Sequence, residues 1–295
     1  MLIKVGNFEF TEVWDGVLYK KLAAYPQISP WEIRTLIEFT EYERSHGREC
    51  EIQCDDEDLL HTIRAGISHR ERYIHTPRPK LITECTACPY RKGCETEFVC
   101  HTTSVENALK IFDSGKLLSA LKARNVPVEE LMRESRNAAN DPADYFEYVM
   151  LAWGNCQAGD RLVMERKLGR FPDEKDLSED FTPGIRFYFK YDELIRHPRA
   201  VCDGVLPMKI KDEIVLTDWV YAIVVPEELR SRVVESIPEK LVGKVVYIKN
   251  DCKDIWDWSE KVYCTIEQPG KNTPDRKYSD IADIKQPEDI GEWKN

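Results

Sequence analysis

Alternation of apolar and polar positions predicts most of the strands in this chain. It is clearest in Ile-Arg-Phe-Tyr-Phe-Lys at residues 185–190. The segment Glu-Cys-Glu-Ile-Gln-Cys at residues 49–54 also alternates, which places Cys50, Ile52 and Cys54 on one face of a strand. Shorter strands are expected at residues 3–5, 8–10, 213–216, 220–225 and 246–248.

Helical spacing and capping residues predict three helix starts. Ser29-Pro30-Trp31-Glu32 combines a serine cap, a proline at the first helical position and an early acid, so a helix is expected from there to about Ser45. A short helix should follow Asp55-Asp56. Ser104 is expected to cap a third helix, whose apolar face follows helical spacing and which Gly115 ends. Residues 119–138 are predicted to be helical and polar, and residues 167–183 to form a charged loop.

The mixture of strands and helices predicts an α+β protein, and 295 residues suggest about two domains. We expect an N-terminal α/β segment over residues 1–80, a cysteine loop over 81–100 and a main domain over 101–235. Residues 236–295 are expected to form a C-terminal extension, and its last part, from 267, has little apolar content and should be loose or draped over the surface.

Charge and hydropathy restrict the function classes. The net charge of −11 argues against a broadly basic surface that binds nucleic acid by counterion release, so any such contact should be local. No window reaches the ~18 apolar residues that span a bilayer, and the N-terminus lacks the pattern of a signal peptide. We therefore expect a cytoplasmic protein without membrane contact, whose ten cysteines are reduced thiols and ligands.

Three cysteines at turn spacing predict a metal centre: Cys85, Cys88 and Cys94. The string Glu-Cys-Thr-Ala-Cys-Pro-Tyr-Arg-Lys-Gly-Cys resembles the cysteine loop of RecB-type and CRISPR-associated nucleases, which holds a 4Fe–4S cluster. The nuclease catalytic pattern is not evident, so the resemblance implies the cluster alone. Cys100 is the nearest fourth ligand, with Cys54 or Cys50 as alternatives. A four-thiolate zinc site is the alternative centre.

The sequence that follows the cysteines, HTTSVENALKIFDSGKLLS at residues 101–119, resembles the first strand and helix of ADP-ribosyltransferases. It is most similar to the DarT family of DNA-modifying toxins, whose opening has a His-x-Thr, an aliphatic residue, an acid-Asn pair and a later Ser-Gly. Three later blocks follow in the order of that family: Asp144-Tyr145 with the run to Trp153, the strand at 185–189, and Glu213-Ile214-Val215-Leu216. The resemblance spans about residues 101–230.

This resemblance implies a split antiparallel sheet of the ADP-ribosyltransferase type, with NAD as substrate. Nicotinamide is a cationic leaving group, so a carboxylate that stabilises an oxocarbenium-like ribose is the main catalytic requirement. The position of Glu213 implies that role. His101 and Thr103 would bind the adenosine-side ribose, and Tyr145 or Tyr148 would stack on the nicotinamide.

The family further implies transfer of ADP-ribose to a nucleic acid, such as a base in single-stranded DNA or RNA, and an antitoxin partner. DarT enzymes also use an arginine between the first helix and the Asp-Tyr block, where no motif selects among Arg124, Arg133 and Arg136. Two alternatives remain at this point. One is the RNA 2′-phosphotransferase reaction, and the other is a non-catalytic nucleic-acid or protein-binding module that its metal centre stabilises.

Overall fold

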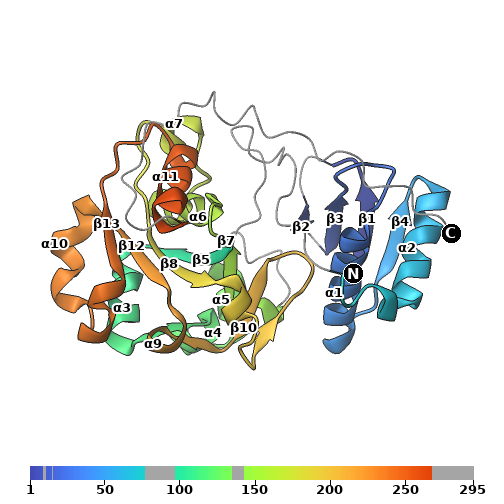
Figure 1. Cartoon of the computed structure of the whole chain (residues 1–295), viewed down its shortest axis with the longest axis horizontal. Helices are drawn as coiled ribbons and strands as arrows, with labels where there is room; N and C mark the ends of the chain where they lie inside the picture. The colour runs from blue at the N-terminus through green and yellow to red at the C-terminus, as the bar shows by residue number, and fades with distance from the viewer. Residues whose placement is uncertain (9–10, 15, 77–96, 135–142, 268–295) are drawn as a thin grey trace.

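The computed structural model describes residues 1–8, 11–14, 16–76, 97–134 and 143–267. These residues form a mixed α+β structure, as the sequence pattern predicted. We call residues 1–76 the N-terminal unit and residues 97–267 the central domain; Figure 1 shows the first in blue and the second in green to red. The three cysteines of the predicted loop and the C-terminal tail from residue 268 lie outside the described residues.

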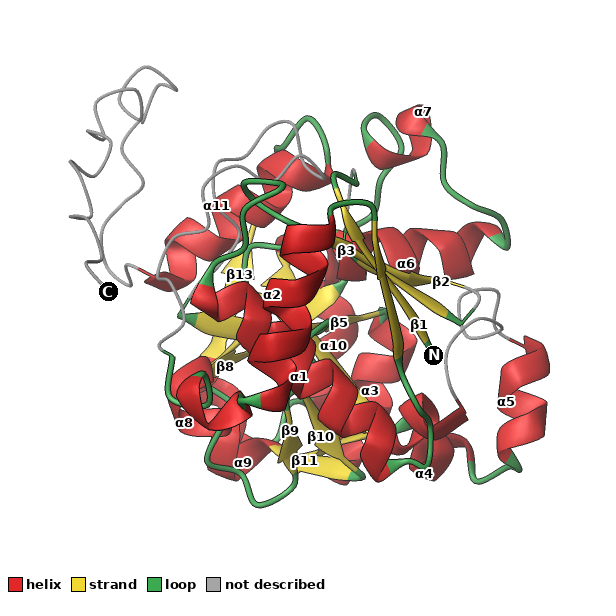
Figure 2. Cartoon of the chain, turned by 90° about the vertical axis from the view of Figure 1, so that its right-hand side faces the viewer, coloured by secondary structure: helices red, strands yellow, loops and turns green. Residues whose placement is uncertain are grey.

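The N-terminal unit is a four-stranded sheet covered on one face by two helices. The strands lie in the order β2 (Glu12–Trp14), β3 (Val17–Lys21), β1 (Leu2–Gly6) and β4 (Glu51–Cys54). Strand β1 runs parallel to both of its neighbours. Helices α1 (Pro30–Ser45) and α2 (Glu57–Ser68) lie side by side (Figure 2), and the 3-10 turn η1 (Arg70–Arg72) follows them.

Local sequence accounts for these elements. The Ser29 hydroxyl accepts from the Glu32 N–H at 3.2 Å while the Glu32 carboxylate accepts from the Ser29 N–H at 2.8 Å, so the predicted start of α1 is confirmed as a capping box. Asp56 caps α2 by one hydrogen bond, in which its carboxylate accepts from the Leu59 N–H at 2.8 Å. The core of the unit packs Ile3 and Leu18 of the sheet against residues of both helices, and the expected cysteine face of β4 packs against that core.

The central domain is built on a seven-stranded sheet. Its order is β13 (Val245–Ile248), β12 (Ala222–Pro226), β8 (Ile185–Lys190), β5 (Phe98–Thr103), β7 (Tyr148–Trp153), β10 (Met208–Lys211) and β9 (Ala200–Val201). Only the β12–β13 pair in this sheet is parallel. A separate two-stranded sheet joins β6 (Lys116–Leu118) to β11 (Glu213–Val215).

Short helices surround this sheet. They are α3 (Val105–Ser114), α4 (Ala120–Arg124), α5 (Val128–Glu134), η2 (Ala143–Glu147), α6 (Ala158–Leu168), α7 (Glu174–Leu177), α8 (Tyr191–Leu194), α9 (Leu216–Trp219), η3 (Glu227–Leu229), α10 (Arg230–Val233), η4 (Val234–Ser236), η5 (Glu239–Lys244) and α11 (Ile255–Glu267). One face of the sheet packs against Phe112 of α3 and Val233 of α10. The opposite face packs against Met164 of α6 and Trp258 of α11.

Two segments differ from the sequence-based expectation. The stretch expected to be helical over 119–138 is divided, in its described part, into two helices, because Asn125 adopts a left-handed conformation and Pro127 cannot continue the first helix. The segment predicted as a loop over 167–183 includes the end of α6 and all of α7. Strand β13 and helix α11, which lie in the expected C-terminal extension, join the sheet and core of the central domain.

The N-terminal unit and the central domain share a buried boundary. The loop at residues 202–206 lies against α1, and its Val205 packs against the core of the N-terminal unit. Gly204 adopts φ +72°, and a Cβ atom on it would lie 1.9 Å from the Thr35 carbonyl oxygen. Only glycine allows this approach of two backbones. Among the helices that the structure describes, none is both long and apolar enough to cross a bilayer.

Candidate functional site

The candidate site lies where two central strands separate. Strand β5 pairs with β8 along its whole length, but it pairs with β7 only at Val99–Trp153 and Cys100–Ala152. His101 is the next residue of β5, and its Nδ1 lies 3.2 Å from the Met150 carbonyl oxygen of β7. The imidazole therefore satisfies a strand carbonyl at the point where backbone pairing between these strands ends.

The environment of His101 fixes its protonation state. Burial disfavours the charged ring and lowers the pKa of His101, with the Met150 hydrogen bond opposing that shift and the Arg166 charge adding to it. The ring is therefore neutral at pH 7. Because a carbonyl can only accept, the proton is assigned to Nδ1, which leaves the lone pair on Nε2. Within the described residues Nε2 has no hydrogen-bond partner, so it can accept from a ligand hydroxyl.

The end of β5 is closely packed by two glycines. A Cβ on Gly159 of α6 would lie 2.4 Å from the Thr102 hydroxyl oxygen, and one on Gly184 would lie 2.7 Å from the Thr103 carbonyl oxygen. The backbones before β8 and at the start of α6 thus press directly onto the strand. Thr103 is itself buried, and helix α3 follows it at once, with Ser104 as its cap. The predicted ends of α3 at Ser104 and Gly115 are confirmed.

Glu213 occupies the start of β11, in the separate two-stranded sheet. Its carboxylate accepts from Lys116 Nζ at 2.9 Å and from Lys122 Nζ at 3.1 Å. These hydrogen bonds, that of Lys116 first, lower the pKa of Glu213 below its usual range, so it is ionised at neutral pH. In the described part of the chain, no hydrogen bond or ion pair connects Glu213 to His101.

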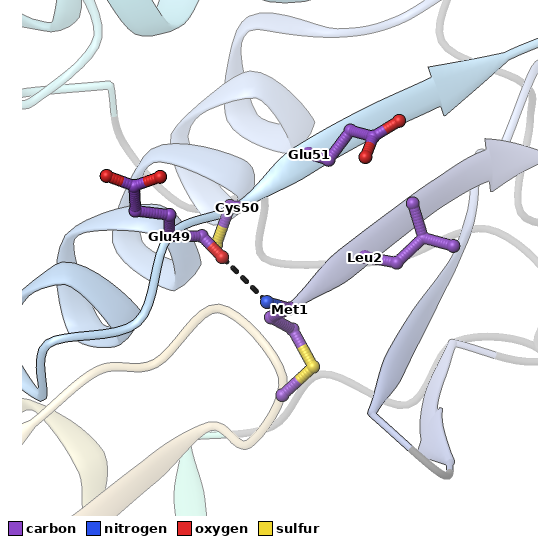
Figure 3. Close-up of a pocket in the computed structure, with 5 residues that line it drawn as sticks. All are labelled: Met1, Leu2, Glu49, Cys50 and Glu51. Carbon is purple, nitrogen blue, oxygen red and sulfur yellow. Dashed lines mark hydrogen bonds between the residues drawn. The ribbon is translucent and has the colours of Figure 1, made fainter.

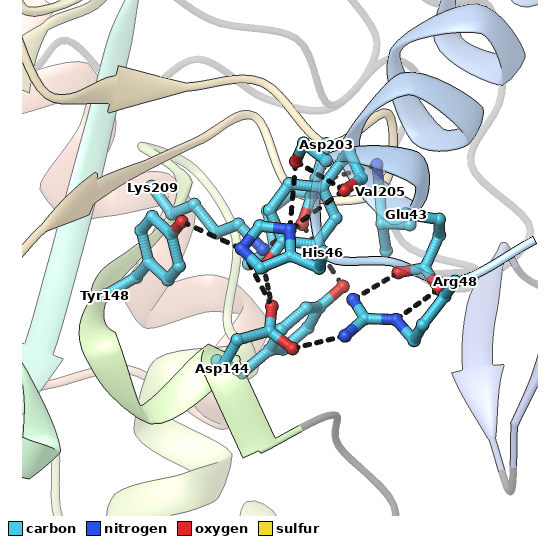
Figure 4. A network of polar contacts seen from close by, with 12 residues as sticks. Glu43, His46, Arg48, Asp144, Tyr148, Asp203, Val205 and Lys209 are labelled. Carbon is cyan, nitrogen blue, oxygen red and sulfur yellow. Dashed lines mark hydrogen bonds and ion pairs between the residues drawn. The ribbon is translucent and has the colours of Figure 1, made fainter.

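Tyr145 and Tyr148 lie together in a buried cluster at the boundary between the two units. Figure 4 shows Tyr148 of this cluster beside Lys209. Both rings face the ammonium of Lys209, at 3.7 Å and 4.8 Å from their centroids, and Tyr42 of α1 completes the cluster at 3.6 Å. Lys209 Nζ also forms an ion pair with Asp203 at 2.9 Å. Both tyrosines are therefore packed around a buried lysine, and stacking of either ring on the nicotinamide stays a prediction.

Sequence reasoning missed Lys209, which sits in the alternating strand Met-Lys-Ile-Lys, because the polar positions of such a strand commonly face solvent. Helix α1 of the N-terminal unit covers that face. The signal in the sequence was the presence of Tyr42, Tyr145 and Tyr148, because a tyrosine that is buried in a protein usually needs a polar partner. Of the arginines considered for the pocket, Arg124 and Arg133 are exposed, and Arg136 lies outside the described residues.

Cys100 is a buried residue of β5. Its Sγ lies 3.6 Å from the Trp153 carbonyl oxygen, and burial raises the pKa of its thiol to about 12. Cys54 ends β4 and Cys50 lies just before it, and both are partly buried against the core of the N-terminal unit. Within the described ranges, no three side chains of the types that bind metal come together. The rest of the predicted centre, Cys85, Cys88 and Cys94, lies outside those ranges, so the cluster stays a prediction.

A pocket of about 390 Å³ opens beside β1 and β4 of the N-terminal unit (Figure 3). Its lining includes the Cys50 thiol, and the Met1 amino group donates to the Glu49 carbonyl at 2.6 Å. Of the residues predicted from the sequence, it contains only Cys50.

The chain matches no known family model, no curated protein and no solved structure. Any functional assignment therefore rests on the residues themselves.

Proposed function

We propose that this chain is a cytoplasmic, NAD-dependent ADP-ribosyltransferase that acts on a nucleic acid. The observation that carries the proposal is the His101 imidazole at the separation of β5 and β7. Its tautomer is fixed by Met150, and its Nε2 is left to accept from a ribose hydroxyl. The order of sequence blocks from His101 to Glu213 supplies the reaction class.

Glu213 is the catalytic residue in this proposal. Cleavage of the nicotinamide glycosidic bond builds positive charge on the ribose, and an ionised carboxylate stabilises that charge. Lys116 and Lys122 support the role in two ways. They keep Glu213 ionised, and their ammonium groups can contact the NAD pyrophosphate when the cofactor is bound.

The acceptor in this proposal is a base in single-stranded DNA or RNA. The acidic chain lacks the overall charge that holds a duplex by counterion release, so contacts to the acceptor should be few and local. An unpaired base needs no extrusion from a helix before it reacts, which fits an enzyme that binds its acceptor weakly.

Incubation with NAD and single-stranded oligonucleotides tests the proposal. Nicotinamide release and a mass increase of the oligonucleotide by one ADP-ribose are expected. Glu213→Gln should lose at least ~100-fold in rate, about 3 kcal/mol of transition-state stabilisation, and keep its NAD affinity. His101→Ala should weaken NAD binding. Glu193→Gln is the matched control, because Glu193 is also a lysine-paired glutamate but lies on α8. Undiminished transfer by Glu213→Gln contradicts the catalytic assignment.

One observation favours a second candidate, a non-catalytic binding module. The ion pairs of Glu213 with Lys116 and Lys122 connect β11 to β6 and α4, so they would also stabilise the fold if Glu213 had no catalytic role. In that case the wild-type protein would not bind NAD. A calorimetric titration with NAD therefore separates the two candidates before any acceptor is known.

A further inference from the structure

The Lys209 cluster connects α1 of the N-terminal unit to the sheet of the central domain. Lys209 and Asp203 are both fully buried, and burial lowers the pKa of Lys209. Three tyrosine rings and one carboxylate surround the ammonium group, and Nζ makes no well-aligned hydrogen bond within the described residues. Cation–π attraction from the three rings and the ion pair with Asp203 thus stabilise a desolvated charge in place of well-aligned hydrogen bonds.

The end of α1 is attached to the same cluster by polar contacts (Figure 4). Asp144 of η2 accepts hydrogen bonds from the Tyr42 hydroxyl and from Arg48, the second at 2.7 Å. Arg48 in turn makes a bidentate pair with the fully buried carboxylate of Glu43, at 2.6 and 2.7 Å. Tyr42 is therefore fixed by its hydroxyl on one side and packed against Lys209 on the other.

This cluster continues to His101 through one residue. Lys209 of β10 is the direct cross-strand partner of Met150 of β7. The Met150 side chain packs against the tyrosines, while its carbonyl oxygen accepts from His101 Nδ1. Backbone pairing of β7 with β5 ends at Ala152. The position of the Met150 carbonyl therefore depends on β10 and on the side chains that cover this part of β7.

We propose that Tyr42 is a positioning residue for His101, acting across the boundary between the two units through Lys209 and Met150. Its ring holds the covered face of β7 and β10, and this keeps the Met150 carbonyl in place to fix the proton of His101 on Nδ1. The effect on ribose binding rests on the proposed function. The effect on the tautomer does not.

Nitrogen NMR of the protein labelled with ¹⁵N-histidine tests this directly, without NAD. The chain has six histidines, and His101→Gln identifies the signal of interest. At pH 7.5 the wild type should show the Nδ1–H form of His101 alone. Tyr42→Leu should lose that signature and show a mixture of both tautomers. Ile63→Ala is the control, because it removes buried side chain from the same unit, in α2, without touching the cluster.

A second variant covers the case in which Tyr42→Leu does not fold. Asp144→Asn keeps the volume of the side chain but removes the charge that holds Tyr42 and Arg48, so it should shift the tautomer in the same direction. An unchanged Nδ1–H signal in whichever of the two variants folds overturns the proposal. So does an equal shift in Ile63→Ala.

Kinetics then separate this inference from the proposed function. If NAD is the substrate, Tyr42→Leu should raise KM for NAD about five- to tenfold with little change in kcat, because one positioned hydrogen bond to the ribose is weakened. Absence of nicotinamide release by the wild type would contradict the proposed function, while the tautomer measurement would still decide the role of Tyr42.

Discussion

Replacing Asp160 by asparagine, which keeps the size of the side chain, should strongly destabilise the central domain. Asp160 of α6 and Arg186 of β8 are both fully buried. The Asp160 carboxylate accepts from Arg186 Nε at 3.1 Å, from a guanidinium Nη, and from the Gly184 N–H at 2.8 Å. Arg186 also donates to the Ser259 hydroxyl at 2.5 Å, which joins α11 to the sheet.

The expected loss follows from these contacts. Asparagine can still accept from Gly184, but its amide group would turn a donor toward the guanidinium. Two charge-assisted hydrogen bonds are then lost, each worth about 1.5–3 kcal/mol, and a buried cation is left without its partner. The pKa of Arg186 is raised by the charge of Asp160 against the effect of burial, and an arginine does not lose its proton at accessible pH. We therefore expect a loss of about 3–5 kcal/mol in the free energy of unfolding.

Urea unfolding, followed by tryptophan fluorescence and circular dichroism, measures this loss. The control is Arg170→Gln, which breaks the pair of Arg170 with Asp176, where the arginine side chain is 50% exposed, and it should cost ~1 kcal/mol or less. The double variant Asp160→Asn/Arg186→Met should be more stable than Asp160→Asn alone, because it removes the unpaired charge. An Asp160→Asn protein within 1 kcal/mol of wild type would refute the reasoning.

Four further predictions follow from the described contacts and from the cysteine spacing. Gly204→Ala should lower the free energy of unfolding by clearly more than Gly169→Ala, because both residues have positive φ but a Cβ at 169 meets nothing within 4 Å. Denaturant unfolding of the two variants measures both losses, and equal losses would contradict the close approach of Gly204 to α1. The pKa of His101 in the folded protein lies below 6.5, so the unfolded protein binds more protons at this residue in acid. The free energy of unfolding should therefore be highest above pH 6.5 and fall as the pH drops toward the folded-state pKa. Denaturation series from pH 7.5 to 5 measure this slope, and His101→Gln should remove the part of it that is due to His101. Lys116→Met should raise the pKa of Glu213, as followed by carboxyl NMR, whereas an unaltered titration would show that Lys122 alone sets it. Anaerobically purified protein should be brown and contain acid-labile sulfide, and Cys88→Ser should misfold; a colourless protein with one zinc per chain would favour the zinc alternative.

Local signals in the sequence were sufficient for individual elements. The start of α1 could be predicted because Ser29, Pro30 and Glu32 act within four residues of one another, and the same holds for Ser104 and Gly115 at the ends of α3. Strand β8 could be predicted because it alternates over its whole length. Helix α6 was missed because its apolar residues do not gather on one face, and its buried Asp160 gives no local signal.

Long-range contacts account for what the sequence could not predict. Tyr42 of α1 lies far along the chain from Asp203 and Lys209, and the burial of this ion pair depends on the position of α1 on the sheet. In the same way, the alternation of β10 indicates which residues share a face but not which face is covered. The joint placement of His101 and Glu213 in one pocket stays a prediction.

The contact of Gly204 and Val205 with α1 also has a consequence for synthesis on the ribosome. Residues 1–76 leave the ribosome long before Val205, which packs into their core. At about 5–20 residues per second, the ribosome needs roughly 6 to 26 seconds to pass from residue 76 to Val205, so the N-terminal unit waits about that long for this loop. During that interval the apolar side of α1 that later receives Val205 is open to chaperones and to other nascent chains. Rare codons between these two segments would lengthen that exposure.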